Sequence, residues 1–456
     1  MGSRLDPFVK AAFWPLLFVL LVIEVRAFAG LPHDDAFIAY RYAENLARGN
    51  GLVFNPGERV LGFTSPLHVL VAAGAHALFG HRALPTVMAA LGCVGWAAQA
   101  SLVYRLLGDA LGRAAAGLVA LLVAVGGAWS ARYVALETNL AVALALGALA
   151  LAFEERWRTS AFVVGLACLA RPDAAIMAGL LAVYAARRLR GRVVVPALCF
   201  LAVVVPWVVF ASVYFGSPVP EPLRVKFQRT GFLPYLEHLL RQGAWSITGV
   251  EQPSTLLIAC TLVVTGGGAA LLVRREPRLG VLALYGALEL ASYLYLRPFR
   301  AHGWHLYPGI FVLCVCAWSL VAAPIATGSW WAYVPGVVLL GGYAWRTLEF
   351  ARYYPTAEWS GARDATYRAA AAYLQEHLRA GARVAAVEVG TLGYYSDVPM
   401  YDLGGLVTKH AAVARKPPRP YACLAVDEHY PSLAPPEQEP VREWTGRFPL
   451  RLFCDP

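Results

Sequence analysis

The sequence predicts an all-α polytopic membrane protein with about 11 transmembrane helices that ends in a small C-terminal α/β domain. Of its 456 residues, 58% are hydrophobic and only 15% are charged, and the mean hydropathy is +0.53. Soluble domains carry about a quarter charged residues, so this composition excludes an ordinary soluble globule. The apolar residues also gather in long runs, whereas a membrane barrel shows alternating segments of about ten residues.

The chain begins with Arg4 and Lys10 ahead of an apolar run over residues 11–23. Small residues at positions 27 and 29 resemble the cleavage site of a secretory signal, but Arg26 beside them disfavours cleavage. Positive residues before an apolar run keep the N-terminus in the cytoplasm. We therefore expect a first membrane span and an extracytoplasmic loop after it.

Ten further apolar segments are separated by short loops that carry the excess positive charge. The net charge is +10, yet the stretch from residue 350 to the end holds 12 Lys/Arg and 12 Asp/Glu. Basic loops of this kind are typical of the cytoplasmic side of a membrane protein, not of a nucleic-acid surface. The expected spans lie near residues 84–104, 114–130, 138–153, 160–170, 174–186, 193–215, 255–273, 279–296, 305–322 and 330–348.

Two topologies fit these segments. In the preferred one, every basic loop is cytoplasmic and residues 66–79 lie along the outer surface without crossing. In the other, residues 66–79 cross the membrane and residues 160–186 form one helix, which places Arg171 and Asp173 beside Pro172 at mid-bilayer. An intramembrane ion pair beside a helix-breaking proline is costly, so the first topology is favoured.

The composition changes near residue 350, because charged residues and prolines become frequent from there to the C-terminus. We expect a membrane domain over 1–349, which includes a first outer loop at 30–80, and a soluble domain over 350–456. Eleven spans after a cytoplasmic N-terminus place this soluble domain outside the cytoplasm.

Within the soluble part, residues 362–379 have the pattern of an amphipathic helix. Strands are expected at 383–389 and 399–403, with a turn at 390–393 between them. Cys423 and Cys454 are the only cysteines after position 350. In an oxidising compartment we expect these two cysteines to form a disulfide.

The first outer loop carries adjacent carboxylates, Asp34 and Asp35, at the start of a short predicted helix. Adjacent acids repel each other, so one of them can have a raised pKa and act as a general base. Alternatively, one of the two only caps the helix, because Asp is favoured at that position. The pattern alone leaves both interpretations open.

The same loop resembles a known superfamily. An acid pair after the first span is the hallmark of GT-C glycosyltransferases, which transfer sugars from polyprenyl-phosphate carriers. The longer string of acid pair, Arg41-Tyr42-Ala43, Asn55–Val60 and Gly62–Leu67 is similar to a bacterial subgroup. That subgroup contains the arabinofuranosyltransferase that adds terminal β-1,2 arabinose in mycobacterial cell walls. Further matches lie at residues 136–140, 170–173 and 401–406.

The resemblance implies an inverting transfer of a sugar, with arabinofuranose first, from a polyprenyl-phosphate donor to a cell-envelope glycan or glycolipid. It implies a multi-pass protein of the bacterial inner (plasma) membrane, with the active site and C-terminal domain outside the cytoplasm. Asp34 is the expected base, with Asp35 as its orienting partner or as the base itself. No nucleic-acid partner is expected.

Further substrate contacts are expected from polar residues that the preferred topology places outside. Arginines suit bidentate contact with a phosphate, although head-group snorkelling is the alternative role for the cations at 224–229. For Glu137, Arg171 and Asp173 the alternative is a structural pairing that buries polar groups. His302 and His305 are expected to hydrogen-bond donor or acceptor, and a divalent metal there is the weaker interpretation. No cofactor follows from any motif. The candidates are Tyr40, Arg41, Glu58, Arg59, Thr64, Ser65, Glu137, Arg171, Asp173, Arg224, Lys226, Arg300, His302 and His305.

Two other classes of function remain open at this point. A transporter or flippase of lipid-linked sugars predicts charged or discontinuous helices and internal repeats, and the sequence shows no convincing repeat. A non-catalytic envelope assembly protein would not need the acid pair for its function. Substitution of Asp34 and Asp35 distinguishes these classes from a transferase.

Overall fold

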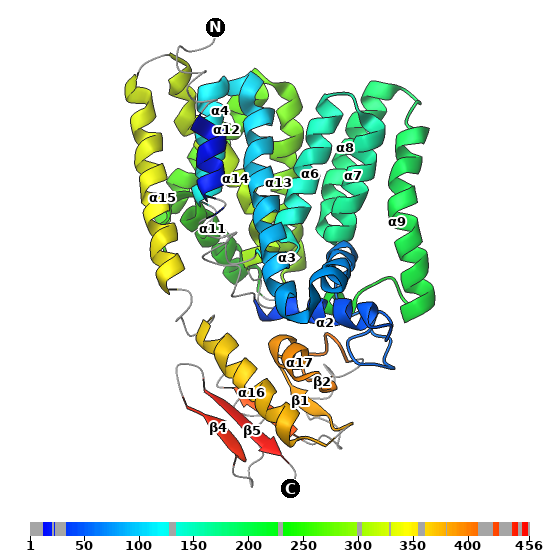
Figure 1. Ribbon diagram of the computed structural model, residues 1–456. Helices are drawn as coiled ribbons and strands as arrows, with labels where there is room; N and C mark the ends of the chain where they lie inside the picture. The colour runs from blue at the N-terminus through cyan, green and yellow to red at the C-terminus, as the bar shows by residue number, and fades with distance from the viewer. Residues whose placement is uncertain are drawn as a thin grey trace. The chain divides into compact units, whose positions relative to one another are not determined.

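The computed structural model describes residues 12–20, 22, 33–126, 134–226, 231–298, 303–327, 330–353, 361–379, 381–408, 423–427, 440–445 and 449–454 (Figure 1). Most of these residues are helical. The α-helices are α2 (Asp34–Ala47), α3 (Pro66–Leu111), α4 (Arg113–Gly126), α6 (Thr138–Phe153), α7 (Trp157–Ala170), α8 (Ala175–Leu189), α9 (Val194–Phe215), α10 (Glu221–Lys226), α11 (Phe232–Thr248), α12 (Thr255–Arg275), α13 (Gly280–Leu296), α14 (Gly303–Ala322), α15 (Val334–Tyr353), α16 (Arg363–His377) and α17 (Gly390–Ser396).

Among the described residues, five helices are long and apolar enough to cross a membrane. They are Pro66–Leu111, Val194–Phe215, Thr255–Arg275, Pro277–Leu296 and Gly303–Ile325. Three further apolar helices are shorter, at 10–17 residues. The number of eleven spans therefore stays a prediction, although helices cover most of the described part of each segment expected after the first loop.

Two breaks in the helices bear on the topology. In α3, Gly80 has φ 80° and ψ 173°, which separates the stretch before it from the long apolar stretch after it. Glycine adopts this conformation without the penalty of a side chain. Between α7 and α8, Arg171 is extended and a 3-10 turn follows at Pro172–Ala174. A single helix over 160–186 is therefore wrong, because the proline lacks an N–H and disfavours helical backbone at Arg171.

The chain forms two compact units. One contains Met1–Phe28, Ala90–Pro206 and Phe227–Phe350, and the other contains Ala29–Ala89, Trp207–Lys226 and Ala351–Pro456. In the first unit, α6 packs against α7, and α14 packs against α12, α13 and α4 around an apolar core. In the second unit, the residues of the first outer loop pack with the C-terminal residues, so segments from both ends of the sequence share one compact body.

The C-terminal part holds a five-stranded sheet. The strands lie in the order β2 (Met400–Asp402), β1 (Val384–Ala386), β3 (Cys423–Asp427), β5 (Leu450–Cys454) and β4 (Arg442–Trp444). The pairs β1–β2 and β1–β3 are parallel, and β3–β5 and β4–β5 are antiparallel. The predicted helix and both predicted strands are present.

The turn predicted at residues 390–393 is wrong. These residues begin helix α17, and α17 packs against both α2 and α16 (Figure 1). Two glycines in four residues favour a turn by local preference, but the first two N–H groups of this stretch have long-range acceptors that stabilise a helix N-terminus.

Candidate functional site in the first loop and the C-terminal domain

Helix α2 begins with both acids in its first turn. His33 is the N-cap, and its Nδ1 accepts the Asp35 backbone N–H at 3.5 Å. Negative charge is favoured here because the N-terminus of a helix carries partial positive charge. The expectation that Asp34 or Asp35 caps α2 is therefore wrong, because His33 occupies that position.

The two acids have different surroundings. Asp34 is only 8% exposed, and its Oδ1 accepts the Thr391 N–H at 2.7 Å while its Oδ2 accepts the Gly390 N–H at 3.2 Å. Asp34 therefore satisfies the first N–H groups of α17, which lies far along the chain. Asp35 is half-buried and lies at the same helix end.

A third carboxyl group comes from the C-terminal domain. The Oδ2 atom of Asp364 accepts a hydrogen bond from Arg368 Nε at 2.6 Å. Its buried Oδ1 has no hydrogen-bond partner in the described part of the chain. Burial raises the pKa of Asp364, and the nearby negative charge of Asp34 adds to this rise against the opposing charge of Arg368. An Asp-x-x-x-Arg pair is ordinary on a helix surface, so no local pattern marks this residue.

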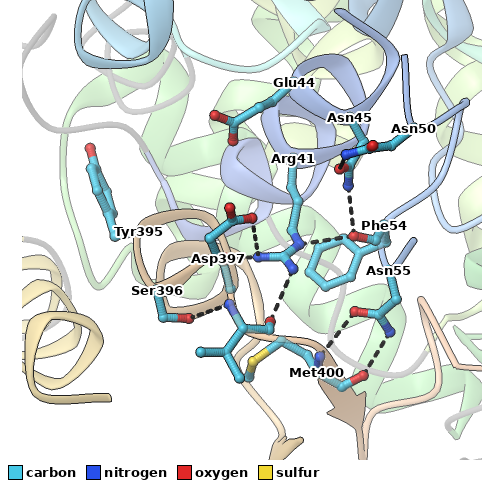
Figure 2. Close-up of polar contacts among 12 residues, drawn as sticks. Arg41, Glu44, Asn45, Asn50, Phe54, Asn55, Tyr395, Ser396, Asp397 and Met400 are labelled. Atoms are coloured by element: carbon cyan, nitrogen blue, oxygen red, sulfur yellow. Dashed lines mark hydrogen bonds and ion pairs between the residues drawn. The ribbon is translucent and has the colours of Figure 1, made fainter. Parts of the chain in front are cut away.

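Arg41 belongs to the same unit and makes several polar contacts there (Figure 2). Its side chain is 2% exposed, and it donates to the Phe54 carbonyl from Nε at 2.9 Å, to the Val398 carbonyl from Nη2 at 3.0 Å and to the Gly393 carbonyl from Nη1. Burial lowers the pKa of Arg41 to about 10, which leaves the guanidinium charged at neutral pH. All three guanidinium nitrogens donate to backbone carbonyls, so this residue ties the loop to the C-terminal domain.

Other loop residues of the resemblance contact the C-terminal domain as well. The Asn55 amide donates to the Met400 carbonyl at 2.8 Å and accepts the Met400 N–H at 2.9 Å (Figure 2). Glu58 forms an ion pair with Arg383. The guanidinium of Arg59 lies 4.5 Å from the centre of the Tyr214 ring. Glu58 and Arg59 are adjacent in the sequence, yet each contacts a residue from a different distant segment.

A charge cluster around the buried Glu44 side chain lies beside this contact. Glu44 Oε1 lies 2.8 Å from His81 Nδ1 and 2.7 Å from Arg48 Nη2, and the His81 ring stacks on Tyr394 with 4.3 Å between ring centres. Burial alone would raise the pKa of Glu44, but the hydrogen bond with His81 and the charges of His81 and Arg48 outweigh burial. The pKa of Glu44 is therefore below its ordinary value.

The Asp402 carboxylate organises the loop that follows β2. It is fully buried, and it accepts the N–H groups of Gly404 at 2.7 Å, Leu406 at 2.6 Å and Val407 at 2.9 Å. Burial raises the pKa of Asp402 to about 6 against the opposing effect of these backbone donors. The motif at residues 401–406 therefore builds a turn in the structure.

The remaining loop candidates divide by exposure. Tyr40 and Ser65 are buried, and Tyr40 lies against the rings of Phe37 and Tyr394. Thr64 is half-buried. Arg224 is exposed, with Nη2 2.9 Å from the Ser217 hydroxyl.

Arg171 is the centre of a polar cluster in the other compact unit. It forms a bidentate ion pair with Asp173, lies 3.5 Å from Glu137 Oε1 and donates to the Trp304 carbonyl at 3.1 Å. The Tyr293 hydroxyl donates to Asp173 Oδ2 at 3.0 Å. The cluster joins the ends of α6, α7, α13 and α14, so Arg171 serves the packing of these helices.

The structure describes little or nothing of several residues that the sequence predicts to contact substrate. Arg300 and His302 lie outside the described residues, as does the side chain of Lys226. His305 is half-buried, and its ring centre lies 6.2 Å from that of Tyr293. No group of three or more His, Cys, Asp or Glu residues able to hold a metal occurs among the residues that the structure describes.

Cys423 is disulfide-bonded, and the β3–β5 register places Cys454 directly opposite it. The pairing of these two cysteines with each other stays a proposal.

Known structures share the fold of the chain. ArnT from Cupriavidus metallidurans bound to undecaprenyl phosphate superposes with a TM-score of 0.62 at 14% identity, over 97% of each chain. The apo form of that protein gives 0.65 at 16% identity, over 97% of this chain and 98% of ArnT. An archaeal oligosaccharyltransferase, AglB from Archaeoglobus fulgidus in complex with an inhibitory peptide and a dolichol-phosphate, gives 0.56 at 13% identity, over 93% of this chain and 70% of AglB.

Sequence comparison adds one domain family. Residues 355–443 match a domain of unknown function, DUF8728, which covers most of the C-terminal part. No curated protein matches the chain by sequence. The full-length superposition defines the class of the fold: the chain has the GT-C fold, as the acid pair and the long apolar helices predict, with a small C-terminal α/β domain.

Proposed function

We propose that the chain is a membrane-embedded, inverting glycosyltransferase that moves a sugar from a polyprenyl-phosphate donor to a cell-envelope glycan or glycolipid. The single observation that supports this function most strongly is the match over 97% of each chain to ArnT bound to undecaprenyl phosphate. The position of the acid pair in the first turn of α2, beside the C-terminal domain, adds chemical support.

The proposed reaction is a direct displacement. A carboxylate of the acid pair removes the proton of an acceptor hydroxyl, and the hydroxyl oxygen attacks the anomeric carbon of the sugar. The bond between that carbon and the phosphate oxygen breaks, and its electron pair stays on the departing polyprenyl phosphate. Attack opposite the leaving group inverts the anomeric configuration. Cations near the phosphate stabilise the charge that develops there.

The exposed arginines are the better candidates for phosphate contact. Arg41 and Arg171 are buried, and their guanidinium nitrogens donate to protein groups. Arg59 and Arg224 are exposed, and a guanidinium suits bidentate contact with a phosphate. Lys226, Arg300 and His302 remain candidates on the sequence argument alone.

The identity of the sugar and the side of the membrane rest on the sequence. The resemblance of the first loop favours arabinofuranose, in the inner membrane of a bacterium. The positive loops favour an active site and a C-terminal domain outside the cytoplasm.

Native mass spectrometry of the protein, gently extracted from its own membranes, tests the donor. A bound species with the mass of a polyprenyl phosphate plus a pentose supports the proposal, and a different increment reassigns the sugar. A transfer assay with that lipid then compares the wild type with the Asp34→Asn/Asp35→Asn double variant. Transfer that survives the double substitution, or a protein that binds no polyprenyl phosphate, would refute the proposed function and favour a flippase or an assembly protein.

A further inference from the structure

The contact between α2 and α17 engages both carboxylate oxygens of one acid of the pair. Both carboxylate oxygens of Asp34 accept backbone N–H groups of α17, and the residue is 8% exposed. An acceptor hydroxyl has to reach a lone pair of the base within hydrogen-bond distance. The packing around Asp34 leaves little access for such a hydroxyl.

The backbone of α17 lies directly against Asp34. A Cβ added to Gly390 would lie 2.0 Å from the Asp34 carbonyl oxygen and 2.7 Å from its Oδ2. Backbone atoms cannot move aside as the end of a side chain can, so only glycine allows this approach. The hydrogen bonds from α17 to Asp34 therefore require glycine at position 390, because any larger residue would separate the two backbones.

Asp35 is more exposed than its neighbour. It is half-buried, and its backbone N–H is held by His33 at the helix cap. Whatever fixes the first turn of α2 also fixes the direction of the Asp35 side chain. In this structure the first turn is fixed by His33 on one side and by the Asp34 contact with α17 on the other.

We propose that Asp34 is a positioning residue, which holds α17 of the C-terminal domain against α2, and that Asp35 is the general base. This assignment rests on the proposed transferase function. It makes the C-terminal domain a required part of the active site, because the residues that hold the base in place come from that domain. It also explains why the first loop and the C-terminal residues form one compact unit.

Hydrogen exchange of the full-length protein in detergent tests the contact without any assay of activity. Asp34→Asn retains one acceptor oxygen, and Gly390→Ala inserts a methyl group against the Asp34 backbone. Both variants are expected to lose protection in residues 389–396 by about tenfold or more, because Asp34→Asn removes the acceptor of one N–H group and the methyl group of Gly390→Ala pushes α17 away from Asp34. Gly74→Ala is the matched control, because nothing lies within 4 Å of its added Cβ. If residues 389–396 keep their wild-type protection in both variants, the inference that Asp34 holds α17 is wrong.

Transfer kinetics test the division of roles. Asp34→Asn and Gly390→Ala are each expected to lower kcat about 10- to 100-fold with little change in the KM of the donor, which is the loss that a displaced base causes. Asp35→Asn is expected to lower kcat about 1,000-fold and to abolish the acidic limb of the pH profile, which the other two variants retain. The Asp34→Asn/Gly390→Ala double variant is expected to be no worse than either single variant.

Two outcomes would overturn the assignment. In the first, Gly390→Ala transfers sugar at the wild-type rate although the amides of α17 have lost their protection from hydrogen exchange. In the second, Asp34→Asn loses the acidic limb of the pH profile although the amides of α17 are still protected. The second outcome would make Asp34 the base. A wild type that transfers no sugar from any polyprenyl phosphate would refute the proposed function and the role of Asp35 with it. The exchange experiment would still decide whether Asp34 holds α17.

Discussion

Replacement of Arg41 by Met is the sharpest test of how the first loop is held. Three charge-assisted hydrogen bonds disappear, and such bonds contribute about 1.5–3 kcal/mol each. The Phe54 carbonyl keeps a second donor in Asn45, at 2.9 Å, and the Gly393 carbonyl keeps the Asp397 N–H, at 3.2 Å. The loss of stability is also reduced because Met is uncharged. Burial of the Arg41 charge is unfavourable, as its pKa, lowered to about 10, indicates, and this cost disappears in the variant.

We therefore expect Arg41→Met to destabilise the contact by about 3–5 kcal/mol, between the loss of one and of three such bonds. Arg41→Lys keeps the charge but has a single nitrogen for three separate carbonyls, so about half of that loss is expected. A tenfold change corresponds to about 1.4 kcal/mol, so hydrogen exchange of residues 393–398 has to accelerate at least 100-fold in Arg41→Met.

Arg48→Ala provides the control. Its side chain is 42% exposed; it pairs with the exposed Asp397 and with the buried Glu44, which keeps His81 as a second partner. Exposed pairs contribute about 0–1 kcal/mol, so exchange of residues 393–398 is expected to change less than about fivefold. If Arg41→Met leaves exchange of this segment within tenfold of the wild type, the reasoning from buried carbonyls is wrong.

Three further outcomes are expected. Asp402→Asn turns an amide N–H₂ toward backbone donors, which costs about 1–3 kcal/mol and is measured as faster exchange of residues 402–408. The lowered pKa of Glu44 means that its contribution to stability is present above the unfolded value of 4.5 and is lost as the pH falls through the lower folded value. Thermal unfolding between pH 3 and 7 should show this loss in the wild type and not in Glu44→Gln. Cys423→Ser is expected to lower stability by about 2–4 kcal/mol, and intact mass with and without reductant checks the pairing with Cys454.

The membrane helices and the break between two of them could be predicted from the sequence, for physical reasons that do not depend on the rest of the fold. Lipid excludes unpaired backbone groups and charges, so long apolar runs predict helices, and these helices are present. Pro172 disfavours a continuous helix whatever surrounds it, which is why the break after Ala170 was predictable. The short helix that begins at Asp34 was predictable from local pattern as well.

The candidate site was predictable only in part. The acid pair and Arg41 stood out in the sequence, but Arg41 was expected to contact the substrate, whereas all three guanidinium nitrogens donate to backbone carbonyls. Asp364 and Gly390 received no site role, because nothing in their local sequence distinguishes them. Both belong to the C-terminal domain, far along the chain from Asp34, and no local pattern encodes a contact of that separation.

By itself, the sequence determined the class of fold, the positions of most of the apolar helices and the presence of an acid pair after the first span, but not the helices Glu221–Lys226, Phe232–Thr248 and Gly390–Ser396. These features follow from local apolar content, local charge and the backbone restrictions of proline. The tertiary structure alone decided that the loop and the C-terminal domain form one unit, and that Asp34 is buried against α17 while Asp35 stays half-buried. Two adjacent residues of identical chemistry can differ only through what packs against them, and that is a property of the folded chain.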